Sequence, residues 1–160
     1  MSERDARRAN VIRTDGTVLG FDVGTRRIGV AVSGGFGLGA RALTVVDVHA
    51  DGPDWTVIDR LYDDWKPSGL VVGDPMTLEA DGDQPARRRA RAFAHELRTR
   101  FRIPVVLMDE RSSSVEAAQR FARERAAGHK RRCDARALDA VAAAIIIERW
   151  LAAPKDAEPL

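Results

Sequence analysis

The spacing of apolar residues predicts that the chain begins with antiparallel strands. Strand-forming and alternating apolar residues flank a turn at residues 24–27, so residues 17–32 are expected to form a β-hairpin. A third strand is expected over residues 42–48. Residues 51–65 repeat their large apolar side chains at helical intervals, which predicts an amphipathic helix after the three strands.

The rest of the chain alternates short apolar runs with amphipathic segments. Residues 70–72 and 103–108 are wholly apolar, which is typical of strands buried on both faces of a sheet. Helices are predicted over residues 85–101, from the capping box at 113–116 to Gly128, and from Asp134 to about Trp150. The order β-β-β-α-β-α-β-α-α predicts an α/β fold, with a mixed five-stranded sheet and helices on both faces.

The length of 160 residues suits a single domain. Residues 1–14 are charged and patternless, so we expect a mobile arm. The domain is expected over residues 15–152, followed by a tail at 153–160 that carries two prolines. No internal repeat or second domain is evident.

The composition favours a cytoplasmic protein. The only cysteine, Cys133, excludes a disulfide within the chain, and no Cys/His group has the spacing of a zinc site. The start of the chain does not resemble a secretory signal. No run approaches the roughly 18 apolar residues of a membrane helix, so we expect no membrane association.

The net charge of +2 hides an asymmetry along the chain. Residues 82–136 contain fourteen arginines and one lysine against seven acidic residues, whereas residues 47–81 contain nine acidic residues against two basic ones. Such a chain offers one region to phosphate groups, so nucleic acid is the expected partner. Arginine makes up 23 of the 26 basic residues, which favours bidentate phosphate contacts, although a GC-rich genome would give the same bias.

Two basic clusters lie in the positive region. The cluster at 130–132 precedes the last predicted helix in a loop, a good place for phosphate contacts beside a metal site. The cluster at 87–91 lies on a helix whose other side is core, so a solvated face is an equally good interpretation. The nucleic-acid-binding candidates are Lys130, Arg131, Arg132, Arg27 and Arg111.

Asp22 lies near the end of the first predicted strand. If residues 25 and 26 form the turn, Asp22 stands opposite Gly29, with Gly20 and Ala31 beside them on the same face. These small neighbours leave space above the carboxylate, which a metal ion and a substrate backbone need. The alternative is an aspartate that only stabilises the turn.

Two further acidic positions follow later in the chain. Asp109 and Glu110 end the last buried strand, where ligands bind in open α/β sheets, and only one of the two should face the site. Alternatively, the pair favours the dipole of a following helix. Asp139 lies in the most apolar helical stretch, where a bare charge is costly, so it must meet a metal, a proton or an arginine such as Arg136.

Together, Asp22, Glu110 and Asp139 would form a hard, oxygen-rich site that suits Mg²⁺ or Mn²⁺. A metal pair about 4 Å apart can activate water and stabilise the leaving oxygen in phosphodiester cleavage. The three histidines are scattered, and no Ser-His-Asp or Cys-His arrangement suggests nucleophilic catalysis. These residues predict a metal-dependent nuclease.

Four segments over residues 17–151 resemble, in this order, the YqgF/RuvX family: GFDVGTRRIGVAVS, VVGDPMTLEADGDQP, VVLMDERSSSVEA and LDAVAAAIIIERWL. The resemblance implies an RNase H-like fold and maps the acidic triad of the family onto Asp22, Glu110 and Asp139. It also implies a nuclease that processes the 5′ end of pre-16S ribosomal RNA, or resolves Holliday junctions, or both.

The chain departs from the family pattern at two places. The family commonly has Asp-Glu-Arg-Leu-Thr-Thr at residues 109–114, where serines replace its last three residues here. It commonly has Gly-Leu-Pro at residues 73–75, where this chain has Asp74, and the loop that follows is longer. In the resembling fold this strand runs between those of Asp22 and Glu110, so we expect Asp74 beside the metal site, as an outer-shell ligand or as a cap of its own loop.

Two other interpretations remain open from the sequence. Residues 20–25 also resemble the first phosphate loop of sugar kinases and actin-like ATPases, although those proteins need two lobes and this chain is long enough for one. A non-catalytic nucleic-acid-binding module is the other possibility, against which the intact acidic triad argues. We expect a monomer or a homodimer.

Overall fold

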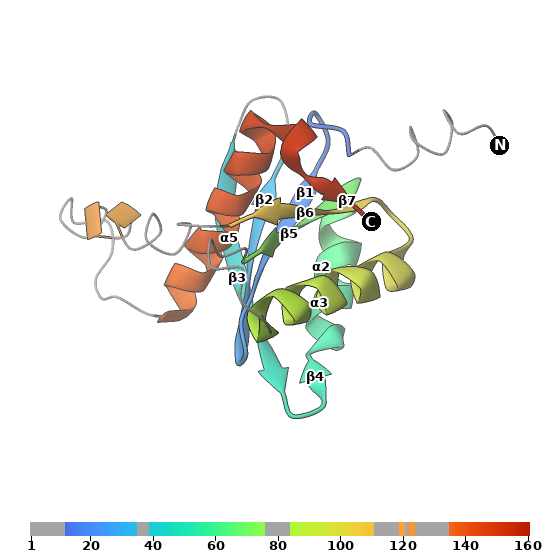
Figure 1. Ribbon diagram of the computed structural model, residues 1–160, viewed down its shortest axis with the longest axis vertical. Helices are drawn as coiled ribbons and strands as arrows, with labels where there is room; N and C mark the ends of the chain where they lie inside the picture. Colours follow the sequence, from blue (N-terminus) through green and yellow to red (C-terminus); the bar gives the residue numbers. More distant parts are fainter. Residues whose placement is uncertain (1–11, 35–38, 76–83, 111–118, 121, 124–134) are drawn as a thin grey trace.

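The computed structural model describes residues 12–34, 39–75, 84–110, 119–120, 122–123 and 135–160. These residues form a seven-stranded sheet of order β4-β3-β2-β1-β5-β6-β7, with helices on both of its faces (Figure 1). The α/β class and the mixed sheet are therefore confirmed. The predicted number of five strands is too low by two short edge strands.

The sheet begins with the predicted hairpin. Strands β1 (Val18–Val23) and β2 (Arg27–Ser33) are antiparallel, and β3 (Ala40–His49) continues the pattern on the other side of β2. On the other side of β1, strands β5 (Gly69–Asp74) and β6 (Val105–Asp109) run parallel to it and to each other. The C-terminal ends of the parallel strands β1, β5 and β6 therefore lie on the same side of the sheet.

The two additional strands are only two residues long. Strand β4 (Gly52–Pro53) pairs with β3, and β7 (Glu158–Pro159) pairs with β6. Each contains a proline, which lacks a backbone donor and is therefore confined to edges or ends of sheets. Two residues show no alternation, so a pattern of apolar positions cannot predict such strands.

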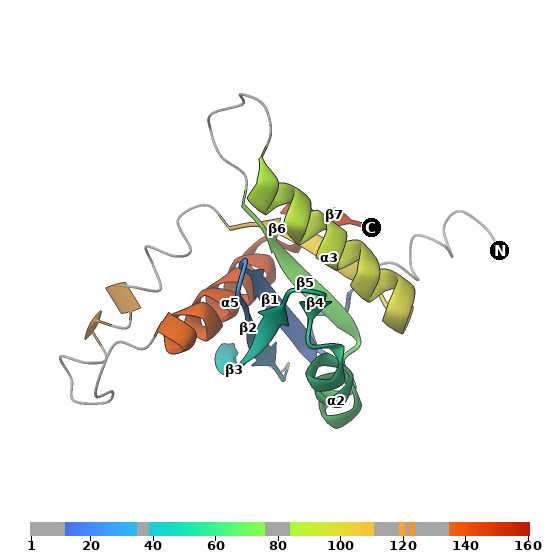
Figure 2. The same cartoon turned by 90° about the horizontal axis from the view of Figure 1, so that it is seen from below.

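Helices α2 (Trp55–Trp65) and α3 (Pro85–Phe101) cover one face of the sheet (Figure 2). Helix α2 begins after Asp54, whose side chain accepts a hydrogen bond from the backbone N–H of Val57 at 3.4 Å. The apolar stripes of both helices pack on Leu19, Phe21, Ile28, Val30 and Val72 to form the larger core. We call this side of the sheet the α3 face.

Helix α5 (Ala135–Ala152) packs on the opposite face, which we call the α5 face. It lies so close to the hairpin that a side chain at Gly29 would collide with the backbone carbonyl of Asp139, and one at Gly20 would collide with Ile147. The small residues predicted on the same face as Asp22 are therefore the surface on which α5 packs, and α5 occupies the space above Gly20 and Gly29.

Both ends of the predicted domain extend further than expected. Ile12 is buried in the core beneath α5, although the predicted arm included it. After α5, a short 3₁₀ helix η1 (Pro154–Asp156) leads into β7, and the backbone N–H of Leu160 donates to the carbonyl of Val105 at 3.0 Å. The predicted tail at 153–160 thus contributes an edge strand to the sheet at Glu158–Pro159. The sequence did not predict this strand, because it is held by backbone pairing and has no apolar pattern.

Candidate active site

Asp22 occupies the predicted position on β1. It pairs with Gly29 in the antiparallel register, and Gly20 pairs with Ala31, as the sequence predicted. Because side chains alternate along a strand, Asp22 shares the α5 face with these small residues, while Phe21 and Val23 point into the larger core. The carboxylate is partly buried beneath the N-terminal half of α5.

Glu110 reaches the same face from the end of β6. Residues Val106 and Met108 of this strand pack beneath α5, so the alternation directs Glu110 to the α5 face and Asp109 to the other. The backbone N–H of Glu110 donates to the carbonyl of Asp74 at 3.0 Å. Its carboxylate lies against Gly73, where any side chain would collide with it.

The carboxyl groups of Asp22 and Glu110 share a hydrogen bond. Burial, followed by the charge of Asp22, raises the pKa of Glu110 to about 9, so Glu110 keeps its proton and donates it to Asp22. Burial and the charge of Asp139 also raise the pKa of Asp22. Two buried carboxyl groups that share one proton form a site that favours a bound cation.

Asp139 projects from α5 toward the same pair and carries an arginine partner. Its carboxylate accepts a hydrogen bond from Nε of Arg27 on β2 at 2.7 Å, and 29% of its side chain is exposed. The arginine suggested by the sequence, Arg136, instead pairs with Asp47 on β3 at 2.8 Å. Sequence spacing pointed to a neighbour one helical turn away, but the sheet beneath supplies the partner.

We call Asp22, Glu110 and Asp139 the acidic site. Among the described residues, no three His, Cys, Asp or Glu side chains already stand in a metal-holding arrangement. The chemistry of the donor set nevertheless fits a hard dication: all three donors are carboxylates, and two of them already share a proton that a cation can replace.

Asp74 does not lie where the sequence predicted. Its neighbour Gly73 faces Glu110, so the alternation along β5 turns the side chain of Asp74 to the α3 face, away from the acidic site. There it pairs with Arg87 and Arg91 of α3 at 3.2 and 3.4 Å. A signal for this contact is the four-residue spacing of the two arginines, which places both on one side of the helix.

Of the nucleic-acid-binding candidates, only Arg27 is described, and it adjoins the acidic site. Arg111 and the cluster of Lys130, Arg131 and Arg132 lie outside the described residues, as do Gly128, Asp134 and the capping box at 113–116. In the other basic cluster, Arg87 and Arg91 are engaged with acidic side chains beneath α3.

The helices of the described residues include none that is long and apolar enough to cross a membrane.

The fold is that of the RNase H-like nucleases related to RuvC. The structure of Thermus thermophilus RuvC in complex with a Holliday junction substrate matches 91% of this chain and 99% of its own, with a TM-score of 0.54 and 19% identity. The yeast mitochondrial Holliday junction resolvase matches 94% of this chain and 85% of its own, with a TM-score of 0.53 and 12% identity. These likenesses establish the class of fold.

The family follows from the sequence comparisons. The family model "RuvX: Holliday junction resolvase" matches residues 16–153, and the chain belongs to this family of phosphodiester-cleaving enzymes. A protein of Xanthomonas euvesicatoria pv. vesicatoria named "Putative pre-16S rRNA nuclease" is 69% identical over 152 residues, which cover 95% of this chain and 97% of the relative. A protein of the same name from Xanthomonas axonopodis pv. citri is 70% identical over 149 residues, with 93% and 96% covered.

Proposed function

We propose that this protein is a divalent-metal-dependent endonuclease that processes the 5′ end of pre-16S ribosomal RNA. The observation that carries the proposal is the convergence of three carboxyl groups on the α5 face: Asp22 from β1, Glu110 from the end of β6 and Asp139 from α5. The names of the relatives that cover nearly the whole chain support the substrate. Such a substrate places the proposed activity in the cytoplasm.

The three carboxylates of the acidic site would hold Mg²⁺ or Mn²⁺. When bound, the metal would supply a Lewis acid that activates water and stabilises the charge of the leaving oxygen. Glu110 has to give up its proton to serve as a ligand, because a protonated carboxyl group is a poor donor to a cation. Asp139 has to exchange its contact with Arg27 for one with the metal.

Arg27 is the proposed phosphate contact closest to the site. With Asp139 as a metal ligand, the guanidinium of Arg27 would be available to an anion, and a nucleic-acid phosphate would fit it. We assign the same task to Arg111 and to the cluster of Lys130, Arg131 and Arg132, on the basis of their place in the sequence on either side of the site residues.

Cleavage of branched DNA is the second candidate function. It is favoured by the description of the family model and by the RuvC structure that holds a Holliday junction. The acidic site suits both substrates, since phosphodiester cleavage needs the same carboxylates in RNA and in DNA.

A panel of substrates tests the proposal. The panel contains a fragment of precursor 16S rRNA, a four-way DNA junction and linear duplex DNA, each with Mg²⁺, with Mn²⁺ and with EDTA. We expect metal-dependent cleavage of the precursor RNA. Cleavage of the junction alone would transfer the assignment to branched DNA, and binding without cleavage of any substrate would indicate a non-catalytic module.

A further inference from the structure

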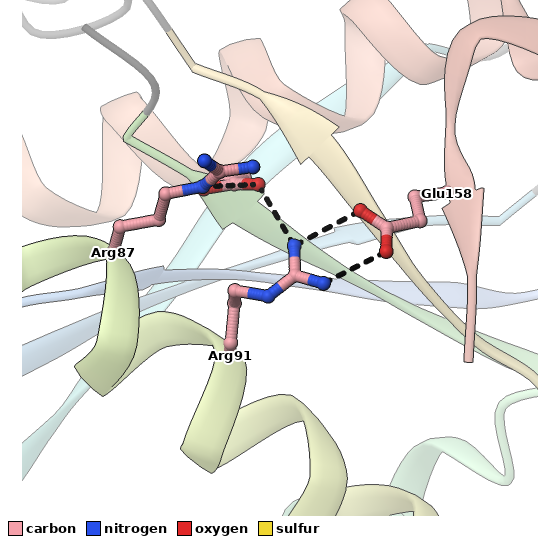
Figure 3. Close-up of polar contacts among 4 residues, drawn as sticks. Arg87, Arg91 and Glu158 are labelled. Carbon is pink, nitrogen blue, oxygen red and sulfur yellow. Dashed lines mark hydrogen bonds and ion pairs between the residues drawn. The ribbon is translucent and has the colours of Figure 1, made fainter. Parts of the chain in front are cut away.

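A network of ion pairs lies on the α3 face, behind the acidic site. The carboxylate of Asp74 at the end of β5 accepts hydrogen bonds from Arg87 at 3.2 Å and from Arg91 at 3.4 Å (Figure 3). Arg91 also donates to both oxygens of Glu158 in β7, at 2.9 and 2.8 Å. We call these four residues the arginine network, and it joins β5, α3 and β7.

Burying the carboxylate of Asp74 in this network has a cost in free energy. The side chain of Asp74 is only 3% exposed, in a strand that is otherwise built of glycine, leucine and valine. A buried carboxylate loses several kcal/mol of solvation, which ion pairs recover only when their geometry is good. An apolar residue of similar size would fill the position without any partner. Stability alone therefore does not account for a charge at this position.

The network connects directly to Glu110. The backbone carbonyl of Asp74 accepts the hydrogen bond from the backbone N–H of Glu110, and the preceding Gly73 lies against the carboxylate of Glu110. The end of β5 therefore touches both the backbone and the side chain of Glu110. A displacement of this strand end would move Glu110 with it, because the hydrogen bond to Asp74 and the packing against Gly73 are both direct contacts.

We propose that Asp74, held by Arg87 and Arg91, is a positioning residue that fixes the end of β5 and thereby the placement of Glu110 in the acidic site. The inference rests on the proposed function, in which Glu110 is a metal ligand. Glu158 takes part because its two hydrogen bonds orient the guanidinium of Arg91 toward Asp74. The C-terminal strand β7 thus contributes to the geometry of a site on the other face of the sheet.

Four substitutions test this role. Asp74→Asn keeps the shape and removes the charge, and Glu158→Gln weakens the outer half of the network. Asp59→Asn is the matched control, because it removes another ion pair of α3, with Arg100 at 2.7 Å, at a distance from the acidic site. Glu110→Gln reports whether Glu110 binds metal at all. Each full-length protein is titrated with Mn²⁺ by calorimetry without substrate, and kcat, KM and Tm are measured.

We expect Asp74→Asn to weaken Mn²⁺ binding about fivefold to tenfold and to lower kcat more than it raises KM, as for other groups that orient metal ligands. Glu158→Gln should act in the same direction with a smaller effect, and Asp59→Asn should match the wild type. If Asp74→Asn does not fold, Glu158→Gln decides by the same criteria.

Two outcomes overturn the inference in different ways. A lower Tm in Asp74→Asn and Glu158→Gln, with Mn²⁺ affinity and kcat within twofold of the wild type, would make the network purely structural and leave the proposed function intact. Wild-type Mn²⁺ binding by Glu110→Gln would remove Glu110 from the metal site. The proposed ligand set and the inference that depends on it would then both fail.

Discussion

The two faces of the sheet hold their carboxylates under opposite conditions. On the α3 face, the arginine network balances two carboxylates with two guanidiniums, and each acidic side chain has a forked or double contact. On the α5 face, the acidic site brings together three carboxyl groups, and within the described part of the chain Asp139 forms an ion pair with Arg27. The first arrangement is complete by itself, whereas the second accumulates negative charge at one point.

The contrast separates acidic residues whose charge is balanced by arginines of the protein from acidic residues whose charge is not. Both groups contain a deeply placed carboxyl group, so burial alone does not distinguish them. What differs is the balance of charge: Asp74 meets cations of the protein, whereas Glu110 meets another carboxyl group and keeps a proton. An excess of buried carboxyl groups is therefore the feature that points to a cation from outside.

The largest expected effect comes from breaking the acidic site itself. Asp22→Asn and Asp139→Asn should leave the fold intact and lower metal-dependent cleavage by about 10³-fold or more, because an amide replaces a metal-binding carboxylate poorly and metal catalysis contributes several kcal/mol. Single-turnover cleavage with Mg²⁺ measures the loss, with Asp47→Asn as the control. Full activity in either variant would remove that residue from the site.

The next effect concerns the basic cluster at residues 130–132, which precedes α5 in the sequence. Replacing Lys130, Arg131 and Arg132 with alanine should weaken nucleic-acid binding similarly for all sequences and lower the slope of log affinity against log salt by about 2 to 3. Fluorescence anisotropy at several salt concentrations measures it. The double variant Arg60→Ala, Lys66→Ala, in the acidic part of the chain, is the control. An unchanged slope would assign the cluster to solvation.

The proton on Glu110 gives a prediction about stability and pH. Its pKa is about 9 in the fold and near 4.5 in the unfolded chain, so the native state binds more protons between these values. The free energy of unfolding of the metal-free protein should therefore fall as the pH rises from about 4.5 toward 9. Glu110→Gln should lessen this fall and stabilise the metal-free protein at pH 8 by about 2 kcal/mol.

Urea unfolding in EDTA at pH 5 and pH 8 measures this difference. Asp64→Asn is a suitable control, because Asp64 is exposed on α2 and is not among the charges that raise the pKa of Glu110. Equal pH dependence of the free energy of unfolding in the wild type and in Glu110→Gln would show that the fold does not raise the pKa of Glu110.

The smallest effect tests whether Arg27 competes with the metal. Arg27→Gln frees Asp139 from a partly exposed ion pair worth about 1 kcal/mol, so Mn²⁺ should bind about threefold to fivefold more tightly without substrate. Calorimetry measures the affinity, and Arg136→Gln, which removes the exposed pair of α5 with Asp47, is the control. Weaker Mn²⁺ binding in Arg27→Gln would instead mean that Arg27 orients Asp139 for the metal.

Much of this arrangement could be predicted from periodicity and from the motif resemblance. The register of Asp22 with Gly29 followed from a two-residue turn, and the choice between Asp109 and Glu110 was limited to one by strand alternation. The same alternation argues against Asp74 as a ligand, since Gly73 and Asp74 must face opposite sides. The position of its strand between those of Asp22 and Glu110 suggested the wrong face.

Partners that come from distant parts of the chain could not be predicted. The contact of Arg27 with Asp139 spans 112 positions, and the spacing of residues carries no information at that range. The same applies to Glu158, which reaches α3 only because two residues of backbone add an edge strand to β6. Strand pairing uses main-chain N–H and C=O groups, so a two-residue edge strand leaves no pattern of apolar and polar residues in the sequence.

The close approach of Gly29 to the carbonyl of Asp139 determines how near α5 lies to the β1–β2 hairpin. Asp22 and Gly29 are cross-strand partners, and Asp139 belongs to the helix turn that rests on Gly29. The separation between the two carboxylates is thus set by one backbone lying directly on another. Even a methyl group at position 29 would push α5 away from the sheet and widen that separation. The distance between these two proposed metal ligands therefore depends on a residue that carries no functional group.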